Sequence, residues 1–490
     1  MSFGGEKHLV LGLIGHNKKY LTQEKFGMKV NAMGRSMQVK QRWTVEQPGG
    51  DDYVLLRSHL DRYLSADAKG NIRCDAEAAG ENERFTVETQ NDGRWAIRSS
   101  AYGCYFGGTD DMLSCRSKTI GNTELWTAQM CIHPQVHLKN VARKRYVKLQ
   151  EGELRITDDI PWGNESVITL GFEDGKHTLQ AYDGTYLRGD GKMVEESSQD
   201  TRFNLELRGG KVTFRDHEGR YLSPFGPRAI LQRRNKTLGK DDFFVLEESV
   251  AQGAFLAHNG KYVSYKQGED LSANQRGNPG NLETFQLEYD DDNGKWAVRA
   301  AVDKYWSLTQ TSGIQLTTMN QITPEALFSI EYGDRCLAMM ANNGKYITAK
   351  PNGHLYATCE SISEKTNLKF QLMNRNALVL RGQYGFVGVK PTSATNKLEC
   401  NCSKYSLVHL TYRDGTYQVR VKGSDGNFLS LGKDGSLSTD GTEPCEFTLE
   451  FHKGNKVCLR APNGNLVKGE QHGTISATGD KVELKTLWEF

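Results

Sequence analysis

Short apolar runs alternate with turn residues along the whole chain, and no stretch keeps a helical period of 3.6 residues for more than a turn or two. A typical unit is the phrase Asn-Gly-Lys-Tyr-Val-Ser at residues 259–264, in which a turn precedes a cation, an aromatic, a β-former and a small polar residue. This order predicts a tight hairpin turn that leads into a strand. We therefore expect an all-β chain of many short hairpins.

The phrase recurs with a fixed period. Its aromatic position marks twelve copies, about 40 residues apart, at Tyr20, Tyr63, Tyr105, Tyr146, Tyr186, Tyr221, Tyr262, Tyr305, Tyr346, Phe386, Phe428 and, in weakened form, Leu466. A second mark closes most copies, as in Trp-Thr-Val-Glu at 43–46 and Phe-Thr-Val-Glu at 85–88. Both marks predict buried anchors on alternating strands rather than catalytic groups.

The pattern restarts after every third copy, which divides the chain into domains 1–131, 132–250, 251–373 and 374–490. A propeller blade also has about 40 residues, but its Gly-His and Trp-Asp signature does not recur, and twelve blades would need two propellers. Three units that close a small barrel form a β-trefoil. We therefore predict four tandem β-trefoil domains of three repeats each, packed on one another because no floppy linker separates them.

Composition adds limits to this prediction. Charged residues make up 25% of the chain and apolar residues 37%, which is typical of a globular protein, and the 51 glycines suit many turns. The net charge is only +2, so we expect no nucleic-acid partner, and any basic site must be local.

Ten cysteines are scattered without a C-x-x-C pair, which predicts free thiols in a reducing cytosol rather than a disulfide framework or a zinc site. The apolar run at residues 9–14 is too short to span a membrane, lacks a signal-peptide layout and is interpreted as a first strand. No H-E-x-x-H, G-x-S-x-G or Walker A string is present. We expect neither an enzyme nor a cofactor or metal site.

Several longer strings resemble the fascin family. They begin with Asn-Lys-Lys-Tyr-Leu-Thr-Gln-Glu at 17–24 and Phe-Gly-Met-Lys-Val-Asn-Ala at 26–32, end with Leu-Trp-Glu-Phe at 487–490, and include residues 92–95, 105–109, 133–136, 143–146, 161–163, 210–212, 270–275 and 283–288. The resemblance covers the chain in order. It implies four trefoils that crosslink parallel actin filaments into tight bundles in filopodia and similar protrusions, a function that the fold alone does not specify.

The resemblance also implies where filaments bind. A monomer that bundles needs at least two binding surfaces, and an acidic filament favours basic ones. Fascins form a major actin site from the first and fourth trefoils. The matching residues are the basic cluster Lys18, Lys19, Lys25, Lys29, Arg35, Lys40 and Arg42, and, in the fourth domain, Arg381, Tyr384, Lys468 and His472. Of these, we expect Lys40 and Lys468 to be exposed.

Further actin surfaces of fascins lie around the second and third trefoils. The second basic cluster is Arg143, Lys144 and Arg145, and the third is Arg228, Arg233, Arg234, Lys236 and Lys240, with Lys266, Lys345 and Lys350 as additional candidates. Ser36 matches the position at which fascins are phosphorylated for regulation. A phosphate there would add about −1.5 to −2 charges and oppose contact with an acidic filament.

Two other classes of function compete with this interpretation. Trefoil lectins carry Gln-x-Trp repeats with aromatics that stack on sugars, but Gln-Arg-Trp at 41–43 is the single such string in the sequence. The chain could instead be a trefoil scaffold whose basic patches bind signalling partners or membranes. Sedimentation with filamentous actin separates these alternatives.

Overall fold

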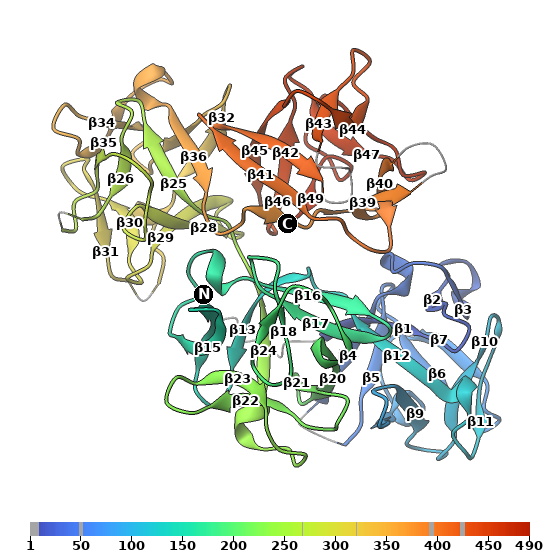
Figure 1. Ribbon diagram of the computed structural model, residues 1–490. Helices are drawn as coiled ribbons and strands as arrows, with labels where there is room; N and C mark the ends of the chain where they lie inside the picture. The colour runs from blue at the N-terminus through green and yellow to red at the C-terminus, as the bar shows by residue number, and fades with distance from the viewer. Residues whose placement is uncertain (1–8, 49–51, 267, 320, 392–395, 422–426) are drawn as a thin grey trace. The chain divides into compact units, whose positions relative to one another are not determined.

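The computed structural model describes residues 9–48, 52–266, 268–319, 321–391, 396–421 and 427–490. Over these ranges the chain forms short strands joined by turns, and its helical segments are single 3-10 turns (Figure 1). The all-β prediction is confirmed. The 3-10 turns are η1 (Phe26–Met28), η2 (Val39–Gln41), η4 (Glu81–Glu83), η5 (Asn122–Glu124), η6 (Asn164–Ser166), η7 (Gln199–Thr201), η8 (Lys240–Asp242), η9 (Pro324–Ala326) and η10 (Glu364–Thr366).

The strands of the described ranges form four sheets, three of twelve strands and one of thirteen. The first contains β1 (Leu9–Ile14), β2 (Tyr20–Gln23), β3 (Val30–Gly34), β4 (Trp43–Glu46), β5 (Leu55–Ser58), β6 (Tyr63–Ala66), β7 (Ile72–Ala76), β8 (Phe85–Thr89), β9 (Trp95–Ser99), β10 (Tyr105–Thr109), β11 (Met112–Ser117) and β12 (Leu125–Met130). The second contains β13 (Gln135–Asn140), β14 (Arg145–Gln150), β15 (Glu153–Asp158), β16 (Ile168–Glu173), β17 (Lys176–Gln180), β18 (Tyr186–Leu187), β19 (Met193–Val194), β20 (Arg202–Arg208), β21 (Lys211–Arg215), β22 (Leu222–Phe225), β23 (Ile230–Arg233) and β24 (Phe244–Glu248).

The third sheet contains β25 (Gln252–Ala257), β26 (Tyr262–Ser264), β27 (Ser272–Gln275), β28 (Thr284–Asp290), β29 (Lys295–Ala300), β30 (Tyr305–Leu308), β31 (Ile314–Thr317), β32 (Ser329–Tyr332), β33 (Leu337–Met340), β34 (Tyr346–Ala349), β35 (Leu355–Cys359) and β36 (Leu368–Leu372). The fourth contains β37 (Ala377–Leu378), β38 (Arg381–Gly382), β39 (Gly385–Pro391), β40 (Asn396–Cys402), β41 (Val408–Arg413), β42 (Thr416–Val421), β43 (Phe428–Leu431), β44 (Leu437–Gly441), β45 (Glu446–His452), β46 (Lys456–Arg460), β47 (Leu466–Gly469), β48 (Ile475–Gly479) and β49 (Trp488–Glu489). Its first strand is interrupted into β37 and β38, which accounts for the thirteenth.

Strand pairing within each sheet closes a barrel. In the first sheet β1 pairs with both β4 and β12, β4 pairs with β5, β9 pairs with β8 and β12, and a bridge between Val54 and Phe85 joins the remaining gap. The hairpins β2–β3, β6–β7 and β10–β11 are bridged to one another through Ala32 with Asp110 and Asn71 with Ser114. First and last strands also pair in the other sheets, as β13–β24, β25–β36 and β38–β49. The prediction of four tandem β-trefoils is therefore confirmed, whereas the residue boundaries of the domains stay a prediction.

The two marks of the repeat occupy different layers. The closing aromatics Trp43, Phe85, Trp126, Phe203, Phe244, Phe285, Phe328 and Phe447 are fully buried, as predicted. The aromatics of the recurring phrase are less uniformly buried, because Tyr63, Tyr262 and Tyr346 are only half-buried. A tyrosine hydroxyl needs a polar partner when it leaves water, and this requirement holds the ring at the edge of the barrel.

That partner is the second mark. The Tyr63 hydroxyl donates to Glu46 (3.0 Å), that of Tyr105 to Glu88 (3.1 Å) and that of Tyr221 to Glu206 (3.1 Å). In each of the first three domains, one such hydrogen bond from a tyrosine hydroxyl joins the first and last repeats. The bonds run from Tyr20 to Gln129 (2.6 Å), from Tyr146 to Glu247 (2.7 Å) and from Tyr262 to Gln371 (2.6 Å). The two periodic marks of the sequence thus meet in space.

The chain divides into two compact units. One runs to Pro161 and includes residues 166–248, and the other comprises residues 162–165 and 249–490. Within the first, Gly209 N–H donates to the Gln47 side chain (2.9 Å), which joins the second domain to the first. Within the other, one hydrophobic core continues through the third and fourth domains, where Phe370 and Phe451 have ring centroids 5.2 Å apart. Neighbouring domains of each unit are therefore packed together, as the short junctions indicated.

Candidate functional site

The first basic cluster lies on three connected turns of the first domain. Lys18, with a φ of 58°, and Lys19 lie between β1 and β2, Lys25 and Lys29 flank η1, and Lys40 lies in η2. Three of these ammonium groups pair with nearby acids: Lys19 with Asp110 (2.6 Å), Lys29 with Asp111 (3.7 Å) and Lys40 with Glu24 (2.5 Å). Lys18, Lys25 and Arg35 are exposed, and no carboxylate of the described residues lies within ion-pair distance of them.

Lys40 is half exposed, with 51% of its side chain in solvent, as predicted. Burial lowers the pKa of nearby His59, and the positive charge of Lys40 lowers it further, so this histidine favours its neutral form. Arg42 is half-buried at the end of η2, and its Nε is buried without a hydrogen-bond partner in the described chain. Arg42 is therefore less accessible to solvent than Lys18, Lys25, Lys29 and Lys40, which are exposed.

Ser36 lies in the bend between β3 and η2 and is half-buried. Exposed Arg35 precedes it, and Lys40 follows on the next turn. This segment is irregular and on the surface, where a modification would not break a β-ladder.

The residues of the fourth domain differ in accessibility. Arg381 is buried, at 9% exposure, donates from Nε to Glu489 (2.5 Å) and lies 5.8 Å from the Phe386 ring. The guanidinium thus ties β38 to β49, and a role of Arg381 in actin binding stays a prediction. Tyr384 is half-buried and His472 is exposed.

Lys468 was expected to be exposed, and the structure corrects this expectation. Only 26% of its side chain is in solvent, and its ammonium lies 3.6 Å from Glu470. Lys485 donates to the same carboxylate at 2.7 Å, and this hydrogen bond is the main cause of the lowered pKa of Glu470. The Lys468, Glu470 and Lys485 side chains form a half-buried ionic triad. The first-domain and fourth-domain sets belong to different units, so their union in one site stays a prediction.

The second basic cluster occupies the turn between β13 and β14. Arg143, Lys144 and Arg145 are all exposed, and Lys144 has a positive φ of 56°. Arg145 donates to the Thr157 carbonyl (2.6 Å) and lies 3.4 Å from Asp159. In the described chain, no carboxylate pairs with Arg143 or Lys144, so this hairpin tip carries uncompensated positive charge.

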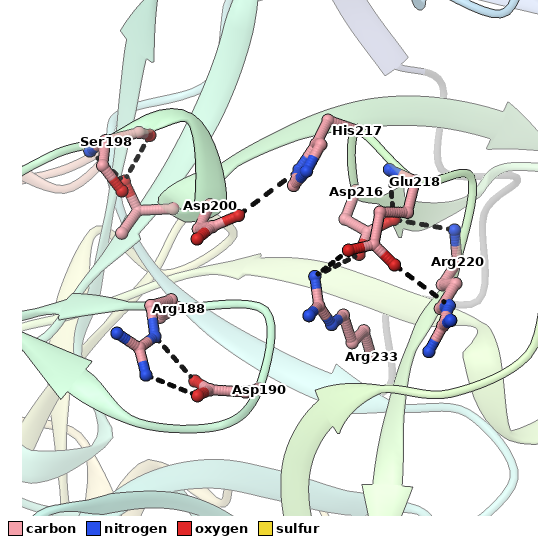
Figure 2. Close-up of polar contacts among 10 residues, drawn as sticks. Arg188, Asp190, Ser198, Asp200, Asp216, His217, Glu218, Arg220 and Arg233 are labelled. Carbon is pink, nitrogen blue, oxygen red and sulfur yellow. Dashed lines mark hydrogen bonds and ion pairs between the residues drawn. The ribbon is translucent and has the colours of Figure 1, made fainter.

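The third cluster separates into structural and exposed cations. Figure 2 shows Arg233 directed at two acids, Asp216 (3.3 Å) and Glu218 (3.1 Å), while Arg188 pairs with Asp190 and His217 faces Asp200 (3.6 Å). Asp216 is buried. Arg233 is therefore an ion-pair partner of the buried Asp216 carboxylate, which needs its charge, and its contact with actin stays a prediction.

The neighbours of Arg233 lie outside that network. Arg234 is exposed, with its guanidinium 4.5 Å from the centre of the half-exposed Phe225 ring. Lys236 and Lys240 are exposed, without an ion-pair partner among the described residues, whereas Arg228 pairs with Glu153 (3.0 Å). The loop at residues 234–240 thus presents three open cations.

The third-domain candidates are mostly engaged. Lys345 lies 3.6 Å from Glu360, and Lys350 donates to Thr358 (3.1 Å) beside the Tyr356 ring. Lys266 is exposed. This set lies in the other compact unit from residues 234–240.

One exposed residue in the first domain was not predicted from the sequence to be a site residue. The Phe26 side chain, between Lys25 and Lys29, is 96% exposed. The sequence signal is an aromatic at a turn where the chain must reverse beside Gly27, but residue type alone does not distinguish an exposed ring from a buried one.

The described residues contain no group of acidic, histidine or cysteine side chains that could hold a metal ion. All ten cysteines are free thiols. In the parts of the chain that the structure describes, no helix has the length and apolar character to cross a membrane.

Comparison with known proteins identifies the family. The Fascin domain model matches four times, at residues 17–128, 136–246, 258–370 and 389–490. Fascin-2 of Bos taurus is 40% identical over 98% of this chain and 97% of its own length, and fascin of Strongylocentrotus purpuratus is 35% identical over 98% of each. Among solved structures, hisactophilin aligns at 21% identity and a TM-score of 0.22, with 25% of this chain and 99% of its own covered. The chain therefore belongs to the fascin family of actin-bundling proteins.

Proposed function

We propose that this protein binds actin filaments and crosslinks them into parallel bundles through at least two separate basic surfaces. The resemblance to fascins over the full repeat supports this function, and the observation that carries it is the open charge of the first unit. Two of its turns present cations that no carboxylate of the described chain neutralises, namely Arg143 and Lys144 in one, and those of residues 234–240 in the other. Such charge is complementary to an acidic filament.

The major surface is proposed to include Lys19, Lys25, Lys29, Lys40 and Arg42 of the first domain, with Tyr384, Lys468 and His472 of the fourth. Lys19, Lys29, Lys40 and Lys468 already have acidic partners, so filament carboxylates would compete with Asp110, Asp111, Glu24 and Glu470. Exchangeable surface pairs contribute little to stability, about 0–1 kcal/mol each. Their exchange therefore costs the protein little. Lys266, Lys345 and Lys350 remain candidates for a further surface.

Phosphorylation of Ser36 is proposed to weaken this surface, because a dianionic group would lie on the same irregular segment as Arg35 and Lys40. The protein is proposed to act as a monomer without a cofactor, in the cytoplasm and in actin-rich projections such as filopodia. No nucleic-acid or membrane-spanning role is part of this proposal.

Low-speed sedimentation of the full chain with filamentous actin tests the function. The wild type should pellet bundles, and the double variant Lys40→Glu with Lys468→Glu should lose most of this activity. Full bundling by the double variant would remove the major surface from the proposal. A Ser36→Asp variant that bundles like the wild type would remove the phosphorylation switch.

A further inference from the structure

The turn at residues 24–29 presents one aromatic side chain to solvent. Phe26 is 96% exposed, more than any other large hydrophobic residue of the described chain. Apolar surface favours burial by about 25 cal/mol per Å², so an open phenylalanine ring is a strong candidate for burial by a partner.

The turn is held in this conformation by contacts at its base. Glu24 N–H donates to the Lys29 carbonyl (2.8 Å), which closes the loop. Gln23, fully buried, donates from its side-chain amide to the Cys74 carbonyl (2.5 Å) and contacts the Met28 sulfur (3.6 Å). Gly27 and Met28 have positive φ values of 65° and 49°, which reverse the chain directly after the ring. Phe26 is therefore presented by a preformed turn, and its ordering adds little entropic cost to binding.

Lysines lie near the ring in the sequence and on the same turn. Exposed Lys25 and Lys29 flank it in the sequence, and Lys40 is tied to Glu24 at the base of the same turn (2.5 Å). The partner that fits this arrangement has an apolar pocket bordered by carboxylates. An aromatic centre with a charged rim is also the usual arrangement of binding energy in protein interfaces.

We propose that Phe26 is the central apolar contact of the first-domain surface and inserts into an apolar pocket of an actin subunit. This inference rests on the proposed function, because Lys25, Lys29 and Lys40 belong to the actin surface named above and the ring is continuous with them. The lysines then orient the protein on the filament and raise the association rate, whereas burial of the ring slows dissociation. An anionic lipid surface has related chemistry and is distinguished by the test.

High-speed sedimentation of the full chain with filamentous actin gives the apparent Kd of Phe26→Ala. We expect a rise of about 10- to 30-fold, the range of an interface anchor. The Phe26→Trp variant should stay near the wild-type value, because it keeps an aromatic ring. Since the side chain touches solvent, neither variant should shift the thermal unfolding midpoint.

Two further measurements distinguish an apolar anchor from a charged contact. The dependence of log Kd on log salt should be unchanged in Phe26→Ala and shallower in Lys40→Gln. The matched control is Val302→Ala, which removes another half-exposed apolar side chain in a turn of the third domain and should leave the Kd unchanged.

The outcomes separate the inference from the function. If the wild type binds actin and Phe26→Ala binds equally well, the inference is wrong and the proposed function stands. If the wild type does not bind actin, the proposed function fails and the inference with it. Loss of binding to phosphatidylserine-containing vesicles in Phe26→Ala, with unchanged actin binding, would assign the ring to a membrane and overturn the inference.

Discussion

At the scale of single residues, Arg233 and Arg234 show how far adjacent cations can differ. Arg233 pairs with buried Asp216, whereas Arg234 lies in the open and stacks near Phe225. Side chains alternate across a strand and its extension, so one residue faces the domain and the next faces solvent. Both are arginines in one basic run, and the difference comes from position alone.

We predict that Arg233→Ala destabilises the second domain by about 2–3 kcal/mol, because the buried Asp216 carboxylate would lose its ion-pair partner and keep only the N–H donors of Glu218 and Arg220. Arg234→Ala should change the free energy of unfolding by less than about 1 kcal/mol. Hydrogen exchange of β22 and β23 in the full chain measures both. Equal protection in the two variants would contradict the structural role of Arg233.

His177 predicts a pH dependence of the same domain. Burial in β17, beside the Phe172 ring, lowers its pKa from 6.5 to about 4. The unfolded chain therefore binds a proton below about pH 6.5, whereas the folded domain does so only near pH 4, and stability falls as the pH decreases between these values. Each pH unit in this window costs up to about 1.4 kcal/mol, or roughly 2 kcal/mol at pH 5.

Hydrogen exchange of β16 and β17 at pH 7 and pH 5, corrected for the intrinsic exchange rate, measures this loss. The His177→Gln variant should lose most of the dependence, whatever its stability at pH 7. The exposed His472→Gln variant is the control and should keep it. A dependence that survives in His177→Gln would assign the effect to another group.

At the scale of elements, the turns before the closing strands share a feature that the repeat pattern of the sequence does not predict. The Glu83 carboxylate accepts the Gly80 N–H (2.7 Å), and Glu124, Asp242 and Glu283 do the same for Gly121, Gly239 and Gly280. These acids cap 3-10 turns or their equivalents, and their role is therefore structural.

The period was predictable because each repeat carries an anchor that must be buried, such as Trp43 or Phe285. Whether a surface cation is free or ion-paired was not predictable in the same way. Lys468 pairs with Glu470, and Arg381 pairs with Glu489, which lies more than a hundred residues away in the sequence. Local patterns predict which side chains enter the core, whereas ion pairing depends on which loops the barrel brings together.

The hydrogen bond between the two periodic marks predicts an effect on closure of the barrel. Tyr262→Phe removes the bond from the Tyr262 hydroxyl to Gln371 (2.6 Å), which joins the first and last repeats of the third domain. We expect a loss of about 1 kcal/mol, the typical net value of such a bond. Hydrogen exchange of β25 and β36 measures it. Tyr356→Phe, which lacks an equivalent acceptor among the described residues, should change it by less than about 0.5 kcal/mol.

At the scale of the whole molecule, bundling differs from binding. A protein with one filament-binding surface decorates filaments, and a second surface on the same chain is needed to join two of them. If the loop at residues 234–240 and the first-domain cluster meet different filaments, loss of one should impair crosslinking more than binding. If the basic surfaces instead attract filaments only through their net charge, loss of one surface should weaken crosslinking and binding together.

The double variant Lys236→Glu with Lys240→Glu tests this distinction, since both side chains are exposed and unpaired within the described chain. We expect the low-speed bundle fraction to fall at least about fivefold, while the high-speed bound fraction changes by less than about twofold, because the remaining surface still binds one filament. The double variant Lys69→Glu with Lys192→Glu changes the net charge equally at two other exposed lysines of the same unit and should leave both fractions unchanged. A parallel loss in both assays would place residues 234–240 on the same filament as the first-domain cluster, and an equal effect of the control would reduce the basic surfaces to net charge.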